Sequence, residues 1–245
     1  MKRLFLQTQT WMKVTLTTLG VLSGISVVIL LIVAGIHIPA FGMWFYYWQY
    51  GANNTYEVVG MYPEHLHALT RHMIDYLRGN EPYLQYYTYI GGTFRPFFSD
   101  IEIRHMVDVR DLVIFSIWLR NIAVILLVVT FGAFFVMRNN AHHIWKYLLK
   151  PWKWTAAITF GIVALLAIII SLDWDRAWYI FHEVIFTNEM FFGNRYWLLQ
   201  PYSDLLINIV PYPFFFTMTV FLAAVFGGGL VAMFVASALL LRRVK

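Results

Sequence analysis

The sequence predicts an all-α polytopic membrane protein with four transmembrane helices and an extracytoplasmic, mainly helical cap. Of its 245 residues, 60% are apolar and 13% are charged, whereas a soluble domain averages roughly 45–50% apolar and about 25% charged residues. Four apolar segments are long enough to cross about 30 Å of hydrocarbon as helices. Basic and acidic residues also occupy different segments between these spans, which is typical of loops on two sides of a membrane.

The four predicted spans cover approximately residues 14–36, 112–136, 154–172 and 214–241. We therefore divide the chain into an N-terminal tail with the first span (1–36), the cap (37–111), the second span (112–136), a cytoplasmic loop (137–153), the third span (154–172), a second extracytoplasmic segment (173–213), and the fourth span with a cytoplasmic tail (214–245). The first apolar run is too long for a typical signal-peptide core, and no clear small-residue cleavage site follows it. We interpret it as a membrane anchor.

The distribution of charge predicts the orientation. Ten basic residues, including every lysine, lie before the first span, between the second and third, and after the fourth, with no acidic residue among them. All thirteen Asp and Glu residues lie in segments 36–111 and 173–211. Because basic residues stay on the cytoplasmic side, we expect a multi-pass protein of the cell membrane with both termini in the cytoplasm and the cap outside. The formal charge of +5 then lies at the membrane surface and does not indicate a nucleic-acid partner.

Helical periodicity predicts most of the cap. A helix is expected to begin at Pro63 and to end at Gly79, and Ser99 or Asp100 is expected to cap the helix that enters the second span. Residues 83–90 favour an extended strand, followed by a turn at the Gly91-Gly92 pair. In the second segment, Phe181, Ile185 and Phe186 indicate a short amphipathic helix. The apolar stripe of the first cap helix consists of Leu66, Leu69, Met73, Ile74 and Leu77.

Several kinds of site are not supported by the sequence. There is no cysteine, so thiolate nucleophiles, thiolate metal sites and disulfides are excluded. No serine-nucleophile motif and no P-loop occurs, and His182-Glu183 lacks the second histidine of a zinc-protease motif because Phe186 stands there. The spacing of His65, His67 and His72 does not bring all three to one helical face. We therefore expect neither a metal nor a cofactor.

His105 and His182 are the strongest candidates for chemistry. Each is expected close to the outer membrane surface, His105 just before the second span and His182 soon after the third. Asp108 lies three residues after His105, on the same helical face, where a carboxylate can hold an imidazole in one tautomer. Arg104 supplies positive charge nearby. The alternative is that both histidines are ordinary interfacial residues.

Two stretches of the chain resemble the lipoprotein intramolecular transacylase family, Lit. One is the run His105-Met-x-Asp108-Val, and the other is Trp174-Asp-x-x-Trp-x-x-Phe-His182-x-x-x-Phe-x-Asn188, followed by Asp204-x-Leu-Ile. The resemblance implies that the enzyme moves an acyl chain within one lipoprotein, from the sn-2 ester of its diacylglyceryl group to the free amine of its N-terminal cysteine. It also implies catalytic roles for His105 and His182. Supporting positions near the site are Asp108, Trp174, Asp175 and Asn188.

The residues themselves are compatible with that chemistry. Ester-to-amide transfer needs no nucleotide, and the substrate supplies both nucleophile and electrophile. Two histidines can act as general base and general acid, while aromatic side chains hold the reacting groups together. Two other readings stay open: a non-catalytic accessory protein that binds lipid or peptide, and a hydrolase that acts on a lipid ester. The implied partners are a diacylglyceryl lipoprotein and membrane lipid. The sequence does not give the oligomeric state.

Overall fold

Four long helices dominate the described residues of the computed structural model, which are 2–137, 144–186, 195–201 and 203–244. They are α1 (Lys2–Phe41), α5 (Asp100–Met137), α6 (Lys146–Leu172) and α10 (Tyr212–Arg243). Each is long and apolar enough to cross a membrane and contains one of the predicted spans, so the prediction of four transmembrane helices is confirmed. The shorter elements are α2 (Met43–Ala52), α3 (Thr55–Val59), α4 (Pro63–Leu77), β1 (Tyr87–Ile90), β2 (Thr93–Pro96), α7 (Trp174–Ile185) and α9 (Leu206–Ile209).

The chain forms two units. One, here called the span unit, consists of Met1–Gly35, Trp118–Ile169 and Leu222–Lys245, and the other, the cap unit, consists of Ile36–Ile117 and Ile170–Phe221. Helix α5 contributes to both: it has 38 residues, about 57 Å at 1.5 Å per residue, which is well beyond the roughly 30 Å of a hydrocarbon core. Its first turns therefore have room to lie outside the hydrocarbon.

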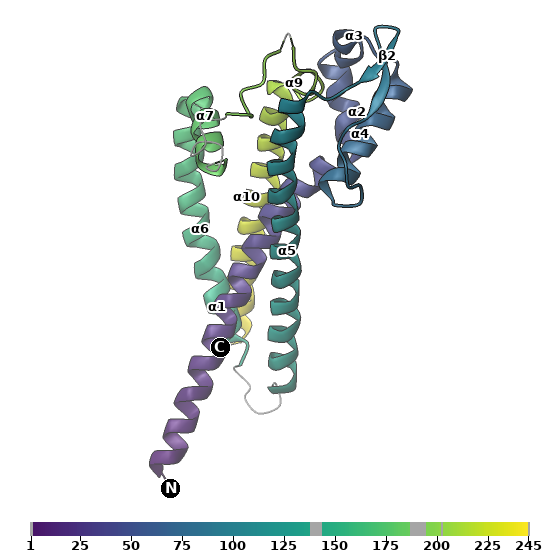
Figure 1. The fold of residues 1–245 in the computed structure, drawn as a ribbon. Coiled ribbons are helices and arrows are strands. Elements are labelled where there is room, and N and C mark those ends of the chain that lie inside the picture. The colour runs from purple at the N-terminus through teal and green to yellow at the C-terminus, as the bar shows by residue number, and fades with distance from the viewer. Residues whose placement is uncertain (1, 138–143, 187–194, 202, 245) are drawn as a thin grey trace. The chain divides into compact units, whose positions relative to one another are not determined.

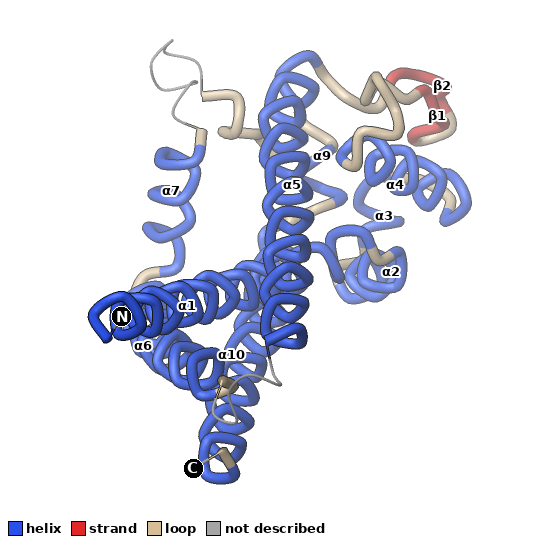
Figure 2. Tube along the Cα trace, turned by 90° about the horizontal axis from the view of Figure 1, so that it is seen from below, coloured by secondary structure: helices blue, strands red, loops and turns tan. Residues whose placement is uncertain are grey.

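Small residues allow α1 and α6 to pack closely in the span unit, where the two helices lie side by side (Figure 2). A Cβ atom on Gly20 would clash with the carbonyl oxygen of Tyr147. Pro151, four residues after Tyr147, has no N–H to bond this carbonyl within the helix. One turn further along α1, the buried Ser23 Oγ accepts a 2.8 Å hydrogen bond from Nε1 of Trp152. Glycine and serine thus permit the backbone approach that helix pairs in lipid use.

The cap unit has its own apolar core, in which α4 contributes one face. Leu66 and Leu69 are completely buried, and they pack with Phe45 and Tyr50 of α2. The hydroxyl of Tyr50 lies 2.7 Å from Oγ1 of Thr70, so these two buried hydroxyl groups are paired with each other. Burying a side chain such as Leu66 contributes about 1.5–3 kcal/mol. The predicted helix from Pro63 and its apolar stripe are confirmed.

A two-stranded hairpin follows α4, and its strands lie beside that helix (Figure 1, Figure 2). The turn consists of Gly91 and Gly92, with φ angles of 58° and 81°. A two-residue hairpin turn with positive φ at both positions favours glycine, which has no Cβ to clash. The backbone N–H of Gly91 also donates a 3.0 Å hydrogen bond to the carbonyl of Gly60 at the end of α3. The predicted turn is thereby confirmed, and the strand predicted over 83–90 is confirmed for Tyr87–Ile90 alone, since residues 83–86 are not in a strand.

Candidate active site

The start of α5 is held by a capping box. The backbone N–H of Ser99 donates a 2.6 Å hydrogen bond to Oε2 of Glu102, and the Ser99 Oγ accepts a 3.4 Å bond from the Glu102 N–H. This reciprocal pattern satisfies two donors at a helix N-terminus. The other carboxylate oxygen of Glu102 accepts from the backbone N–H of Leu206 in α9. Glu102 is 1% exposed, so it fixes the start of α5 to α9, one helical turn before His105.

Helix α7 places His182 on its buried side. Asp173 caps this helix by accepting a 2.9 Å hydrogen bond from the backbone N–H of Arg176. Trp174 and Trp178, one turn apart, stack with ring centroids 6.2 Å apart, and His182 follows one turn later. The prediction of a short amphipathic helix in the second segment is confirmed. His182 is 6% exposed, whereas Tyr179 on the same helix is 42% exposed.

His105 and His182 face each other within the cap unit. Their ring centroids are 6.4 Å apart, and the ring of Phe186 lies 5.1 Å from His105 and 5.5 Å from His182. The ring of Trp197 lies 4.9 Å from that of His182. Two titratable side chains from helices far apart in the sequence therefore share one aromatic enclosure, as their expected depth indicated.

The tautomer of His182 follows from its hydrogen bond. Nδ1 lies 2.8 Å from the carbonyl oxygen of Trp178, and because a carbonyl oxygen only accepts, Nδ1 must carry a proton. In the neutral ring Nε2 is then left as the acceptor. Burial lowers the pKa of His182 below its ordinary value of 6.5, and the hydrogen bond to Trp178 opposes this effect. The ring is consequently neutral at neutral pH, with a basic nitrogen available.

His105 is held differently from the expectation. In the described part of the chain, its Nδ1 is buried and has no hydrogen-bond partner, so Asp108 does not form the orienting bond proposed for it. Arg104 points to another group: its guanidinium donates a 3.1 Å hydrogen bond to the hydroxyl of Tyr196 and lies over that ring. The i+3 spacing places Asp108 on the same helical face as His105, but it does not bring the two side chains into contact.

The other predicted positions lie around α7. The indole N–H of Trp174 is buried without a hydrogen-bond partner among the described residues, and its ring lies 5.2 Å from that of Phe216. Asp175 accepts a 3.0 Å hydrogen bond from the hydroxyl of Tyr212 at the start of α10. Asn188 lies outside the described residues.

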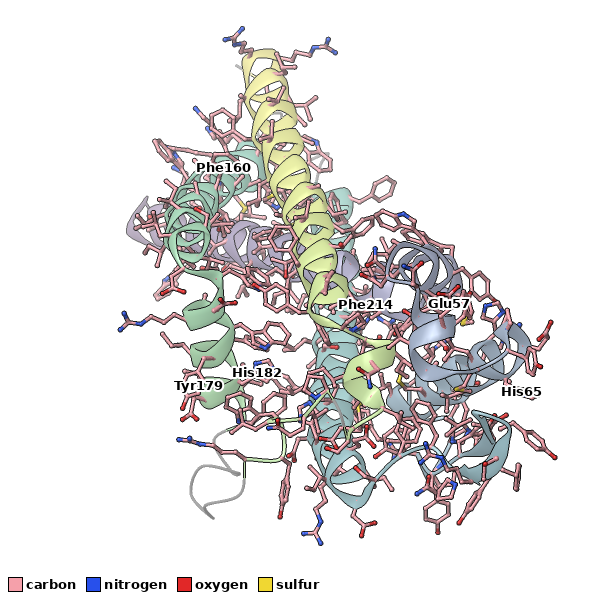
Figure 3. The ribbon with its side chains drawn as sticks, turned by 90° about the horizontal axis from the view of Figure 1, so that it is seen from above. Glu57, His65, Phe160, Tyr179, His182 and Phe214 are labelled. Atoms are coloured by element: carbon pink, nitrogen blue, oxygen red, sulfur yellow. The ribbon has the colours of Figure 1, made fainter. Side chains whose placement is uncertain are left out.

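The histidines of α4 have separate local partners. Nε2 of His67 lies 2.9 Å from the hydroxyl of Tyr56, and Nε2–H of His72 donates a 3.1 Å hydrogen bond to the carbonyl of Leu84. His65 lies on the opposite side of the cap unit from His182 (Figure 3). These side chains are therefore not part of the His105–His182 pair.

Three features of the site were not predicted from the sequence. Trp178 supplies both a carbonyl acceptor and a ring 4.4 Å from His182, and the signals available for it were its place in the Trp174–Asn188 motif and its i−4 spacing from His182. Phe186 contacts both histidines, and Glu102 is a tertiary anchor as well as a first-turn acid.

Comparison with known families agrees with this architecture. A family model described as "Lipoprotein intramolecular transacylase Lit" matches residues 21–215. The chain belongs to the Lit family. The resemblance inferred from the two histidine motifs is thus confirmed, and the protein is an acyltransferase integral to the membrane.

Solved structures of Lit from Bacillus cereus show the same fold. One matches with a TM-score of 0.70 and 18% identity, covering 96% of this chain and 98% of the other. A variant of that protein with one histidine changed to arginine matches with a TM-score of 0.67 and 18% identity, covering 99% and 98%. A variant with alanine at the same position gives a TM-score of 0.67 and 17% identity, covering 97% of each chain. No curated protein matches the chain.

Proposed function

We propose that this Lit protein transfers an acyl chain from the sn-2 ester of a diacylglyceryl lipoprotein to the α-amine of the same lipoprotein's N-terminal cysteine. The observation that carries the proposal is the buried pair of His105 and His182 in an aromatic enclosure, with Nε2 of His182 left as an acceptor. The product is a lyso-form lipoprotein with one ester replaced by an amide.

His182 is suited to act as the general base. The neutral α-amine attacks the sn-2 carbonyl carbon, and Nε2 of His182 takes a proton from the nitrogen as the C–N bond forms. An amine with a pKa of about 7.7–8.0 is partly neutral at physiological pH, so the base has to remove only the second proton. The Trp178 carbonyl stabilises the imidazolium through the Nδ1–H bond, as orienting acceptors do in acyl-transfer enzymes.

His105 is suited to return that proton to the leaving group. When the C–O bond breaks, the sn-2 oxygen needs one proton. His182 has taken one proton from the amine, so the two transfers balance. A neutral imidazole can receive a proton at one ring nitrogen while giving one from the other. His105, 6.4 Å from His182 between ring centroids, would pass the proton on in this way. No proton is gained or lost by the two rings over the cycle.

The enclosure has a second task, which is to bring amine and ester together. Holding reacting groups of one molecule in an attacking geometry removes entropy from the barrier, and water exclusion prevents hydrolysis. Rings from Trp178, Phe186 and Trp197 surround the histidines. The unpaired indole N–H of Trp174 would give a donor for a substrate oxygen. A buried N–H without a partner costs about 1–3 kcal/mol, which such an oxygen would offset.

The proposed orientation puts this chemistry on the extracytoplasmic face. The span unit contains no Asp or Glu, and the acidic residues belong to segments of the cap unit. By the positive-inside rule the lysine-bearing ends face the cytoplasm. The substrate is then a lipoprotein with a free N-terminal cysteine in the outer half of the cell membrane.

The test uses purified full-chain protein and a diacylglyceryl lipopeptide with a free N-terminal cysteine, analysed by tandem mass spectrometry. Wild type should give a product of unchanged total mass with an acyl group on the cysteine nitrogen. His182→Gln and His105→Gln should each lower the rate at least about 100-fold, because general acid–base catalysis contributes roughly 10²–10⁴-fold.

His72→Gln is the matched control, since His72 also donates a ring N–H to a backbone carbonyl but lies in α4. Its transfer rate should stay near that of wild type. Wild-type rates in the double variant His105→Ala/His182→Ala would refute the mechanism. Release of free fatty acid by wild type would instead identify a hydrolase.

A further inference from the structure

The span unit contains a groove far in sequence from the histidine pair. It has a volume of about 570 Å³ and is lined by residues of α1, α6 and α10. Two lysines, Lys146 and Lys150, one turn apart on α6, give it positive charge, and Tyr147 and Trp154 give it aromatic walls. Its other lining residues are Thr17, Val21, Pro151 and Leu241. Both lysines and Trp154 are exposed, so a ligand has access to them.

The lysine charges have no acidic counterpart in this unit. None of its three segments, 1–35, 118–169 and 222–245, contains an Asp or a Glu. The Nζ of Lys146 lies 5.3 Å from the ring centroid of Tyr147, which is a weak cation–π contact compared with a charge-assisted hydrogen bond. The groove therefore presents two exposed ammonium groups that no acidic side chain of this unit can pair.

The walls of the groove specify the kind of anion. Val21 and Leu241 come from apolar stretches of membrane-spanning helices, where acyl chains are the surrounding solvent. Trp and Tyr are enriched where hydrocarbon meets headgroups, and basic pockets between transmembrane helices bind anionic headgroups. A free phosphate ion would use the ammonium groups but leave the apolar and aromatic walls uncovered.

We propose that this groove binds an anionic phospholipid, with its phosphate between Lys146 and Lys150 and an acyl chain along the apolar wall. The bound lipid would neutralise the two lysines and lie against both α1 and α6 where these helices pack around Gly20. The binding site is separate from the proposed acyl-transfer site and does not depend on the reaction proposed there.

The experiment measures lipid binding to the purified full chain in a non-ionic detergent, by native mass spectrometry, and needs no lipoprotein substrate. The probes are phosphatidylglycerol, phosphatidylcholine with the same acyl chains, and inorganic phosphate. Phosphatidylglycerol should bind wild type most tightly. In Lys146→Gln/Lys150→Gln its affinity should fall about 30-fold, because each basic residue near an anionic lipid contributes about 1 kcal/mol.

The control Lys153→Gln/Arg243→Gln removes the same charge from α6 and α10. Neither residue lines the groove. The Nζ of Lys153 lies 5.5 Å from the ring centroid of Phe234 and 5.6 Å from that of Trp154, so this control also tests whether a charge beside the aromatic wall contributes to binding. This variant should bind phosphatidylglycerol within a few-fold of wild type. A second variant, Val21→Trp, fills the groove and keeps both lysines, and it should also lose binding. It remains informative if the lysine variant does not fold.

Four results would overturn the proposal. They are equal affinities in the two double variants, unchanged binding in Val21→Trp, equal affinity for phosphatidylcholine, and displacement of the lipid by millimolar inorganic phosphate. The last of these would identify a phosphate ion as the ligand.

Discussion

Replacing Glu102 with glutamine tests how the start of α5 is held. The carboxylate accepts two backbone N–H groups, from Ser99 at 2.6 Å and from Leu206. An amide keeps one acceptor oxygen and turns an NH₂ group toward the other donor, leaving one buried N–H unpaired. That loss costs about 1–3 kcal/mol. At about 2–4 °C per kcal/mol for a chain of this size, a mid-range loss of about 2 kcal/mol lowers the Tm by about 4–8 °C.

Circular dichroism at 222 nm during heating measures this change in Tm. Cysteine-reactive dyes are unsuitable because the chain has no cysteine. Asp100→Asn is the control, since Asp100 is exposed in the same first turn and its removal changes the helix-dipole interaction alone, by about 0.3–1 kcal/mol. Well below the Tm, Glu102→Gln should also slow acyl transfer, because Glu102 fixes the turn before His105. A Tm equal to or above that of Asp100→Asn would refute the anchoring role of Glu102.

Three other perturbations test separate parts of the structure. Gly20→Ala should lower the free energy of unfolding by about 1–3 kcal/mol through overpacking, because its Cβ would meet the Tyr147 carbonyl. Gly161→Ala is the control and should not lower it, because Gly161 has open space around it. Equal melting temperatures of the two variants would contradict the close contact between the helices. Leu66→Ala should cost about 2–5 kcal/mol because Leu66 is completely buried in the cap core, and a loss below about 1 kcal/mol in chemical denaturation would contradict that position. The pH–rate profile should bend twice on its acid side. The first bend lies at about pH 7.7–8.0, where the substrate amine becomes protonated. The second lies below pH 6.5, because burial lowers the pKa of His182 and the base is lost as pH falls through that lowered value; a second bend above pH 6.5 would show that His182 is not the base.

Much of the architecture follows from local pattern in the sequence. The spans are set by runs of apolar residues, and the α4 face is set by 3.6-residue periodicity that places Leu66 and Leu69 together. The hairpin turn follows from two successive glycines that tolerate positive φ. Depth relative to the spans placed His105 and His182 at one level, and the structure brings their rings together.

The contacts that define the site have no such local signal. Glu102 bonds to Leu206, 104 residues away, and no spacing rule connects two such positions. The orienting acceptor of His182 is the backbone carbonyl of Trp178, and because every residue type possesses a backbone carbonyl, no residue type signals this acceptor in the sequence. Asp108 shares a helical face with His105 but does not accept from its Nδ1 among the described residues. Helical geometry predicts the direction in which a side chain points, while the partner of that side chain depends on the packing around it.

An isotope crossover experiment tests whether the acyl transfer is intramolecular. Two diacylglyceryl lipopeptides of different peptide mass are mixed, one with a ¹³C-labelled sn-2 acyl chain and the other unlabelled, and both are incubated with the wild-type protein. Intramolecular transfer catalysed by the two histidines predicts that labelled acyl chains appear on the cysteine nitrogen of their own peptide alone, and that neither His105→Gln nor His182→Gln yields this product at a comparable rate. Labelled acyl groups on the other peptide, or free labelled fatty acid, would contradict it.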